Sequence, residues 1–375
     1  MTNLNYNYKI NYITILVSLL SIIYILFTNS YFSIESSFVY GGADGESYLK
    51  IAEASPNITN EYIQPIHSER FIISYLIGFL ANILEVDIYL LFRCFVIICI
   101  LLLNYFLIKI LSLFNFSLNS TLISILLVNL NPYITRFYIA NPLIINDLVF
   151  HLGGVYCVLG LILTDKKKFF IGLIISIIAR QSALAIFLGV LFSKFLLNEK
   201  FFLNKKDILF SLIIILFFYF IGFQYSSNTT TYVEQRYDQY YITIFGIFIE
   251  NKSLKELFIF FVWPFLSFGP LVLYSLLYLK IDLFKLKKNT IFNLYTLSFC
   301  LLIFLQPILQ GIDVGGKNII RLSTLAFIPT LILLNINSLN NKNKSIKNII
   351  FIILLWVWSC HPTFSKFTFL ENFKF

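Results

Sequence analysis

Long apolar runs separated by short polar segments dominate the chain. The candidate membrane crossings are residues 10–29, 88–110, 112–130, 142–164, 169–180, 181–197, 208–223, 257–279, 290–310, 319–338 and about 348–362. A crossing needs roughly 20 apolar residues, and the run at 70–84 is short for one, so we expect it to lie along the membrane interface. The pattern therefore predicts an all-α, polytopic transmembrane bundle of about 11 spanning helices plus an interfacial helix in the first outer loop.

Composition agrees with this class. Hydrophobic residues make up 58% of the 375 residues, charged residues 13%, and the mean hydropathy is +0.82. A soluble protein carries about a quarter charged residues. The five cysteines have no CxxC spacing and the three histidines do not cluster, so the sequence indicates no zinc or haem site.

The net charge of +9 follows the membrane pattern and not a nucleic-acid pattern. Lysines gather in short clusters between apolar runs: Lys166 to Lys168; Lys200, Lys205 and Lys206; Lys280, Lys285, Lys287 and Lys288; Lys342, Lys344 and Lys347. Cytoplasmic loops carry such an excess. We therefore expect a cytoplasmic N-terminus and an outer loop at 30–69, which holds six acidic residues and one lysine. The aromatic residues lie within the apolar runs, so no nucleic-acid partner is expected.

Two carboxylates, Asp44 and Glu46, stand in the glycine-rich stretch Gly41–Tyr48, which the sequence predicts to be a turn after the first crossing. The predicted topology brings further polar residues to the same outer side: Glu69, Arg70, Arg136, Asp147, Arg180, Gln181, Arg236, Asp313, Lys317, Asn318 and Arg321. Ionisable residues at the bilayer usually mark a site.

Such a set suits a particular chemistry. A carboxylate can take the proton of an acceptor hydroxyl, and arginines can hold the negative charge that develops on a phosphate leaving group. A polyprenyl-phosphate sugar has an apolar tail for lipid, a phosphate at the interface and a sugar in water. The sequence thus favours transfer of a lipid-linked sugar at the outer face.

The order of these features resembles the GT-C class of integral-membrane glycosyltransferases, in the style of the bacterial aminoarabinose and mannosyl transferases. The resemblance covers residues 10–200. It rests on five stretches: Gly42-Ala43-Asp44-Gly45-Glu46-Ser47-Tyr48, Glu69-Arg70-Phe71, Arg93 with Lys109, Asn131-Pro132 to Arg136 with Asn146-Asp147, and Ala179-Arg180-Gln181. Two stretches depart from the family. Gln64-Pro65-Ile66-His67 stands where the family often has a Glu-Lys-Pro-Pro-like sequence, and Arg180 replaces a lysine.

The resemblance implies a role for each candidate residue. Asp44 would be the general base of an inverting transfer, and Glu46 its helper or, with it, the ligand of a possible divalent cation. Arg70, Arg180, Lys317 and Arg321 would bind the lipid phosphate, Asp147 would orient the sugar or a basic residue, and Arg136 and Gln181 would complete the substrate site. Residues 1–200 would form the catalytic module, and 201–375 further helices with an outer loop at 224–256.

The expected partners are a polyprenyl-phosphate-linked sugar, membrane lipids, and a glycan, lipid or protein acceptor. The expected location is the bacterial inner membrane. Two alternatives stay open. An exopolysaccharide or O-antigen polymerase shares the many spans, the outer arginines and the lipid phosphate. A transporter or flippase usually shows internal repeats and charges near mid-membrane, and the two halves of this chain are not similar.

Overall fold

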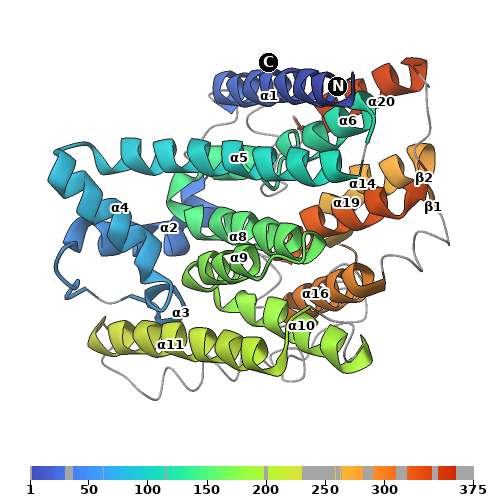
Figure 1. The fold of residues 1–375 in the computed structure, drawn as a ribbon. Coiled ribbons are helices and arrows are strands. Elements are labelled where there is room, and N and C mark those ends of the chain that lie inside the picture. The colour runs from blue at the N-terminus through green and yellow to red at the C-terminus, as the bar shows by residue number, and fades with distance from the viewer. Residues whose placement is uncertain are drawn as a thin grey trace.

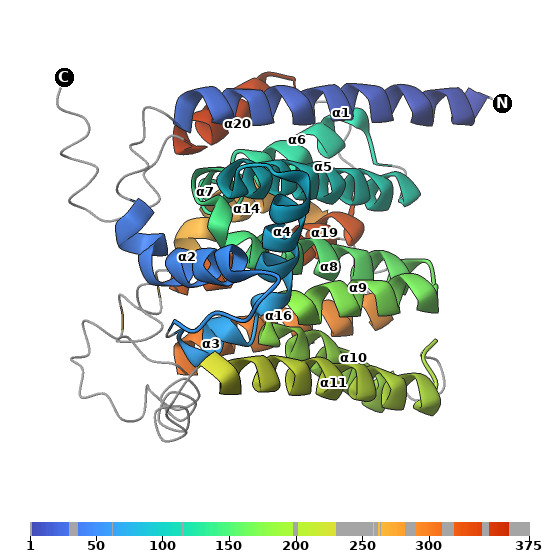
Figure 2. The ribbon, with the colours of Figure 1, turned by 90° about the vertical axis from the view of Figure 1, so that its left-hand side faces the viewer.

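The computed structural model describes residues 2–29, 37–61, 63–114, 116–197, 202–229, 258, 262, 264–281, 290–309, 319–339 and 345–359. Helices account for nearly all of these residues (Figure 1). In the view turned by 90°, the long helices lie side by side in a stack, from α1 at one edge to α11 at the other (Figure 2). The helices α2 and α3 lie toward one end of these long helices.

The first part of the chain forms α1 (Thr2–Asn29), α2 (Ser37–Ala54), α3 (Pro65–Ser68), α4 (Phe71–Leu84), α5 (Ile88–Leu113), α6 (Leu118–Asn129), α7 (Thr135–Ala140), α8 (Ile145–Ile162) and α9 (Lys166–Ala179). The rest forms α10 (Leu184–Leu197), α11 (Lys205–Thr229), α14 (Pro264–Tyr278), α16 (Thr290–Leu309), α18 (Ile319–Thr324), α19 (Phe327–Ile336) and α20 (Ser345–Ser359). The two-residue strands β1 (Lys280–Ile281) and β2 (Ser338–Leu339) pair antiparallel. Short 3₁₀ turns at Pro142–Ile144 and Gln181–Ala183 precede α8 and α10.

The predicted all-α class is confirmed, and each predicted apolar run contains a helix. The run at 319–338 is divided between α18 and α19. Three helices of the described chain are long and apolar enough to cross a membrane: Ile88–Leu113, Pro142–Ile162 and Lys205–Ser227. The other apolar helices are shorter, between 10 and 17 residues in their apolar part.

The helix α8 lies at the centre of the bundle, because 89% of its apolar window is buried, against 28% for α11. Glycines allow α9 to approach α8 closely. A Cβ built on Gly153 would lie 2.4 Å from Ser176 Oγ, and one built on Gly172 would lie 2.6 Å from the backbone nitrogen of Cys157. Small residues at helix contacts are a common packing device in membranes.

One hydrophobic core joins the two predicted modules, since it extends from Ile22 to Leu355. Large apolar side chains also cover much of the outer surface of the helices at the edges of the stack; examples are Phe27, Leu102, Phe217 and Trp356. Soluble monomers rarely expose large apolar patches, so exposed apolar side chains on this many helices fit contact with lipid.

The predicted turn at Gly41–Tyr48 is wrong, because these residues lie within α2. Tyr48 and Ile51 are buried, and Asp44 lies on the same side of the helix, four residues before Tyr48. This helical spacing was visible in the sequence and outweighs the flexibility of the glycines, since burial of one face stabilises a helix more than propensity does.

Two glycines allow the elements around α2 to pack closely against one another. A Cβ on Gly78 of α4 would lie 2.0 Å from the carbonyl oxygen of Ala52, so α4 packs directly on the backbone of α2. A Cβ on Gly222 of α11 would lie 2.7 Å from the carbonyl oxygen of Glu69. The segment between α3 and α4 is therefore held against α11, and its side chains start from a fixed backbone.

Candidate active site

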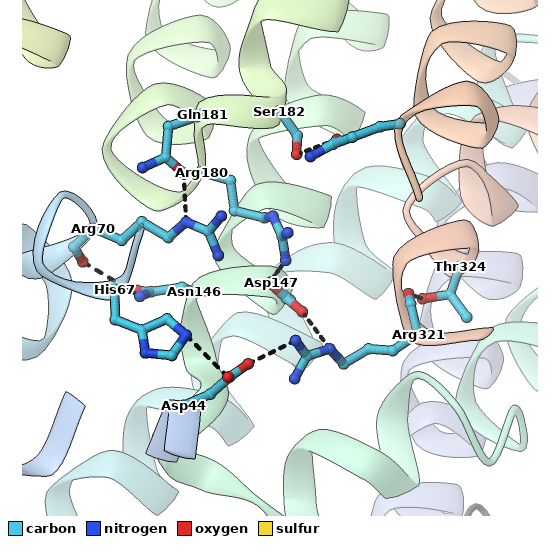
Figure 3. Close-up of polar contacts among 11 residues, drawn as sticks. Asp44, His67, Arg70, Asn146, Asp147, Arg180, Gln181, Ser182, Arg321 and Thr324 are labelled. Atoms are coloured by element: carbon cyan, nitrogen blue, oxygen red, sulfur yellow. Dashed lines mark hydrogen bonds and ion pairs between the residues drawn. The ribbon is translucent and has the colours of Figure 1, made fainter. Parts of the chain in front are cut away.

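Four charged side chains from distant parts of the sequence form a continuous chain of ion pairs (Figure 3). Arg321 Nη2 donates to Asp44 Oδ2 at 2.7 Å, and Arg321 Nε lies 3.3 Å from Asp147 Oδ2. The other oxygen of Asp147 accepts a hydrogen bond from Arg180 Nη1. Side-chain exposure falls along this chain from 17% at Asp44 to 3% at Arg180, so Asp44 is its most accessible member.

Local structure explains how each group reaches the site. Asp147 lies in the first turn of α8, where the helix dipole favours a carboxylate. Arg180 follows α9 in an extended conformation, with φ −155° and ψ 144°, and this break turns its side chain toward α8. Arg321 lies on the short helix α18, and Thr324 Oγ1 donates to its carbonyl oxygen at 2.6 Å.

His67 of α3 completes the surroundings of Asp44. Its Nε2 lies 2.9 Å from Asp44 Oδ1, and its Nδ1 lies 3.1 Å from the hydroxyl of Ser47. Burial on its own would raise the pKa of Asp44, but the positive charge of Arg321 and the hydrogen bond from His67 outweigh it. The pKa of Asp44 is therefore held well below its usual range, and the carboxylate is ionised while these partners remain.

A fifth charged group, Arg70, lies beside this chain. Its side chain is buried, and its Nε donates to Gln181 Oε1. Figure 3 shows its guanidinium pointing toward that of Arg180. Among the described residues Arg70 forms no direct ion pair with a carboxylate. The neighbouring Glu69 accepts a hydrogen bond of 3.0 Å from the Gln181 amide, so Gln181 links Arg70 to Glu69. The backbone carbonyl of Arg70 accepts from Asn146 Nδ2 at 3.3 Å, which ties this segment to α8.

Arg70 and Gln181 also stand at the polar end of a cavity of about 570 Å³. Its lining is mostly apolar and comes from α10, α11, α16 and the segment around α3; it comprises Ile66, Glu69, Arg70, Gln181, Ser182, Leu184, Ala185, Leu188, Tyr219, Phe220, Phe223, Leu302 and Gln306. Ser182 donates to Gln306 at 2.8 Å, so the polar residues of the lining gather where α10 begins. A volume of this size and a few polar groups are typical of a small-molecule site.

Several buried polar atoms near the ion pairs have no hydrogen-bond partner among the described residues. They include Arg321 Nη1, Arg180 Nε and Asn146 Oδ1. Buried polar groups are normally satisfied, and an orphaned donor costs about 1–3 kcal/mol. The site thus has hydrogen-bonding capacity to offer a polar ligand.

The structure brings together Asp44, Arg70, Asp147, Arg180, Gln181 and Arg321 from the set chosen on sequence grounds. Two other members lie elsewhere. Glu46 is exposed and pairs with Lys50 at 3.2 Å. Arg136 donates to Ser359 at 3.3 Å and stacks over the Tyr24 ring at 5.8 Å, so it joins α7 to α20 and α1. Lys317, together with Arg236, Asp313 and Asn318, lies outside the described residues.

The predicted pairing of Asp44 with Glu46 around a divalent cation does not fit α2. Residues two apart on a helix do not face each other, and the two carboxylates have different partners: Arg321 and His67 for Asp44, Lys50 for Glu46. Within the part of the chain that the structure describes, no three His, Cys, Asp or Glu side chains are grouped as metal ligands.

Sequence reasoning missed His67, Ser47 and Asn146. A signal existed for two of them: Ser47 follows Asp44 by three residues, which is about one helical turn, and His67 follows the rigid Pro65 in the predicted outer loop. Comparisons of the chain with protein-family models, with curated proteins and with solved structures gave no match.

Proposed function

We propose that this protein is a membrane glycosyltransferase of the GT-C type. It would move a sugar from a polyprenyl-phosphate donor to an envelope glycan, lipid or protein acceptor at the outer face of the membrane. The observation that carries the proposal is Arg70, a buried guanidinium that bonds Gln181 and has no direct ion pair among the described residues. It lies at the junction of an apolar cavity and a buried set of ion pairs.

The charges around Arg70 favour an anionic ligand. Arg180 and Arg321 are ion-paired with Asp147 and Asp44, whereas Arg70 is linked to the third carboxylate, Glu69, only through the Gln181 amide. Burying a guanidinium against a neutral amide instead of a carboxylate is costly. A phosphate between Arg70 and Arg180 would remove this cost, and the planar guanidinium suits phosphate oxygens well.

The cavity favours a ligand that is also a lipid. Its wall is mostly apolar along α10, α11 and α16, and the polar residues Glu69, Arg70, Gln181, Ser182 and Gln306 are hydrogen-bonded to one another near the start of α10. This distribution fits a molecule with an apolar chain and a charged head. A prenyl chain would lie along Leu188 and Phe220, with its phosphate near Arg70 and its sugar toward Asp44.

Asp44 is the proposed base, because it is the most accessible carboxylate of the network and belongs to α2 at the rim of the bundle. Its ion pair with Arg321 keeps it a weak base until that guanidinium moves. Donor phosphate would attract Arg321 and so free an oxygen of Asp44 for the acceptor hydroxyl. General-base assistance of this kind contributes about 10²–10⁴ in rate.

The proposed orientation follows from the two ends of α9. Lys166 begins this helix and pairs at 2.6 Å with Asp207 at the start of α11, while Arg180 follows its other end. A 14-residue helix is about 21 Å long. The lysine-rich segment and the site therefore lie at opposite ends of α9. The lysine excess marks the cytoplasmic side. We therefore propose about eleven crossings in a bacterial inner membrane, with the N-terminus inside and the site outside.

Ligand stabilisation of the purified protein in nanodiscs tests the central step. Polyprenyl phosphate should raise the melting temperature at concentrations where the neutral polyprenol of the same length does not, and Arg70→Gln should remove this difference. A glycosyl-transfer assay with a labelled polyprenyl-phosphate sugar then tests the reaction. Equal stabilisation by both lipids would refute the phosphate site, and movement of the intact lipid across the bilayer without transfer would support a flippase.

A further inference from the structure

We propose that His67 is a positioning residue for the transfer. It holds Asp44 Oδ1 so that the other carboxylate oxygen, Oδ2, takes the acceptor's proton. This inference rests on the proposed function and assigns a role to a residue outside the phosphate site. His67 is buried, and its ring bridges two side chains of the same helix (Figure 3).

The bridge fixes the direction of the Asp44 carboxylate. Asp44 and Ser47 are three residues apart on α2, so their side chains lie one above the other on one face. His67 Nε2 lies 2.9 Å from Asp44 Oδ1 and His67 Nδ1 lies 3.1 Å from Ser47 Oγ. An imidazole held at both nitrogens cannot rotate freely, and neither can the carboxylate that it binds.

Hydrogen-bond roles assign a proton to one ring nitrogen of His67. An ionised carboxylate only accepts, so Nε2 must carry the proton and donate to Asp44. His67 Nδ1 lies 3.1 Å from Ser47 Oγ, and a hydroxyl can donate or accept a hydrogen bond. The geometry therefore places a proton on Nε2.

The two carboxylate oxygens of Asp44 then have different roles in the transfer. Oδ2 is bound to Arg321, which has a second partner in Asp147 and can move toward a donor phosphate. Oδ1 stays with His67. In the transfer, the acceptor oxygen forms a bond to the sugar's anomeric carbon and its proton passes to Asp44 Oδ2. The bond between that carbon and the phosphate oxygen breaks, and its electron pair leaves with the phosphate.

The backbone around His67 is fixed enough for this role. Pro65 begins α3, and Ser68 Oγ donates to the Pro65 carbonyl at 3.0 Å. The Tyr48 ring packs 5.5 Å from the imidazole, and Gly222 of α11 contacts the adjacent Glu69 carbonyl. Positioning groups must themselves be held by their neighbours.

Two conservative variants separate the two nitrogens. The amide nitrogen of Gln can reach the place of Nε2 and donate to Asp44, whereas that of Asn reaches only the place of Nδ1 and contacts Ser47. We expect His67→Gln to retain kcat within about fivefold. His67→Asn should lower kcat by about 30-fold or more while KM for the lipid donor changes less than about threefold, because the loss is confined to the transition state. A merely structural role would affect both variants alike.

The outcomes distinguish this inference from the proposed function. If Asp44→Asn retains full transfer, the assignment of Asp44 as base is wrong. If Asp44→Asn is inactive but His67→Asn equals the unaltered protein in kcat, only the role of His67 is refuted. Where His67 variants do not fold, nitrogen NMR of the imidazole in the intact chain replaces them. The chain has three histidines, so replacing His151 and His361 in turn assigns the His67 signals. They should report a proton on Nε2 and shift in Asp44→Asn, and unchanged signals would overturn the proposal.

Discussion

Arg321 donates a hydrogen bond of 2.7 Å to Asp44, although 277 residues separate them in the sequence. This contact joins α18 to α2 and occupies one oxygen of the proposed base. Arg321 also reaches Asp147, so a single guanidinium serves both carboxylates of the site. An anionic ligand of Arg321 must therefore compete with both carboxylates.

The first prediction concerns the two acidic residues of α2. Asp44→Asn should lower glycosyl transfer by about 10²-fold or more, since a general base commonly contributes 10²–10⁴. Glu46→Gln should retain most of the activity, because Glu46 is exposed and paired with Lys50. Both variants are measured with a labelled lipid-linked sugar at matched protein amounts. A large loss in Glu46→Gln would restore the interpretation that both carboxylates act together.

The second prediction is a pH dependence of stability. The pKa of Asp44 is lowered in the folded protein, because Arg321 and His67 outweigh the opposing effect of burial. The unfolded value is about 3.9. A group with a lowered folded pKa stabilises the fold above its unfolded pKa, and this contribution is lost as the pH falls through the folded value.

The melting temperature of the protein in detergent should therefore exceed that of Asp44→Asn by a constant amount from pH 8 down to about 4. Below about pH 4 the difference should shrink. Glu46→Gln is the matched control. A difference between the two proteins that already disappears between pH 7 and 5 would show that Asp44 is not held ionised by these partners.

Much of the helical fold could be predicted from the sequence, because long apolar runs favour helices. The partners of the charges could not be predicted. Arg136 and Arg180 both follow apolar helices in the sequence, yet one stacks on Tyr24 and the other pairs with Asp147. Only the packing of α7, α8 and α9 decides between these outcomes. The helix α2 was missed because its glycines resemble a turn, although Asp44, Tyr48 and Ile51 already had helical spacing.

The third prediction compares Arg70, which we propose binds the donor phosphate, with Arg136, which joins helices. Arg70→Gln should raise KM for the lipid donor by tenfold or more, since a hydrogen bond to a charged group contributes about 1.5–3 kcal/mol. Arg136→Gln should instead lower the melting temperature and leave KM unchanged, because Arg136 bonds Ser359 and packs on Tyr24. Transfer kinetics and thermal unfolding are measured on both proteins. A raised KM in Arg136→Gln would place that residue in the substrate site after all.

The fourth prediction tests the contact between α8 and α9, which sets the distance between Asp147 and Arg180. Gly153→Ala should destabilise the protein by about 1–3 kcal/mol, because its Cβ would lie 2.7 Å from the backbone nitrogen of Ser176. Gly154→Ala is the matched control: nothing lies within 4 Å of its Cβ, and alanine favours a helix by about 0.5–1 kcal/mol. Unfolding in denaturant compares the two variants, and equal stability would contradict the packing.

The fifth prediction concerns the cavity. Leu188 lines it, so Leu188→Trp should narrow the space for a lipid chain. We expect transfer from a long-chain donor to fall by tenfold or more, while a donor with a short chain is affected less. The magnitude follows from losing about 1.4 kcal/mol or more of lipid contact, which is close to two buried methylene groups. Leu216→Trp adds the same volume to an exposed position of α11 outside the cavity. It should leave the rate of transfer from both donors unchanged. If Leu188→Trp lowers transfer from both donors equally, the cavity does not hold the chain.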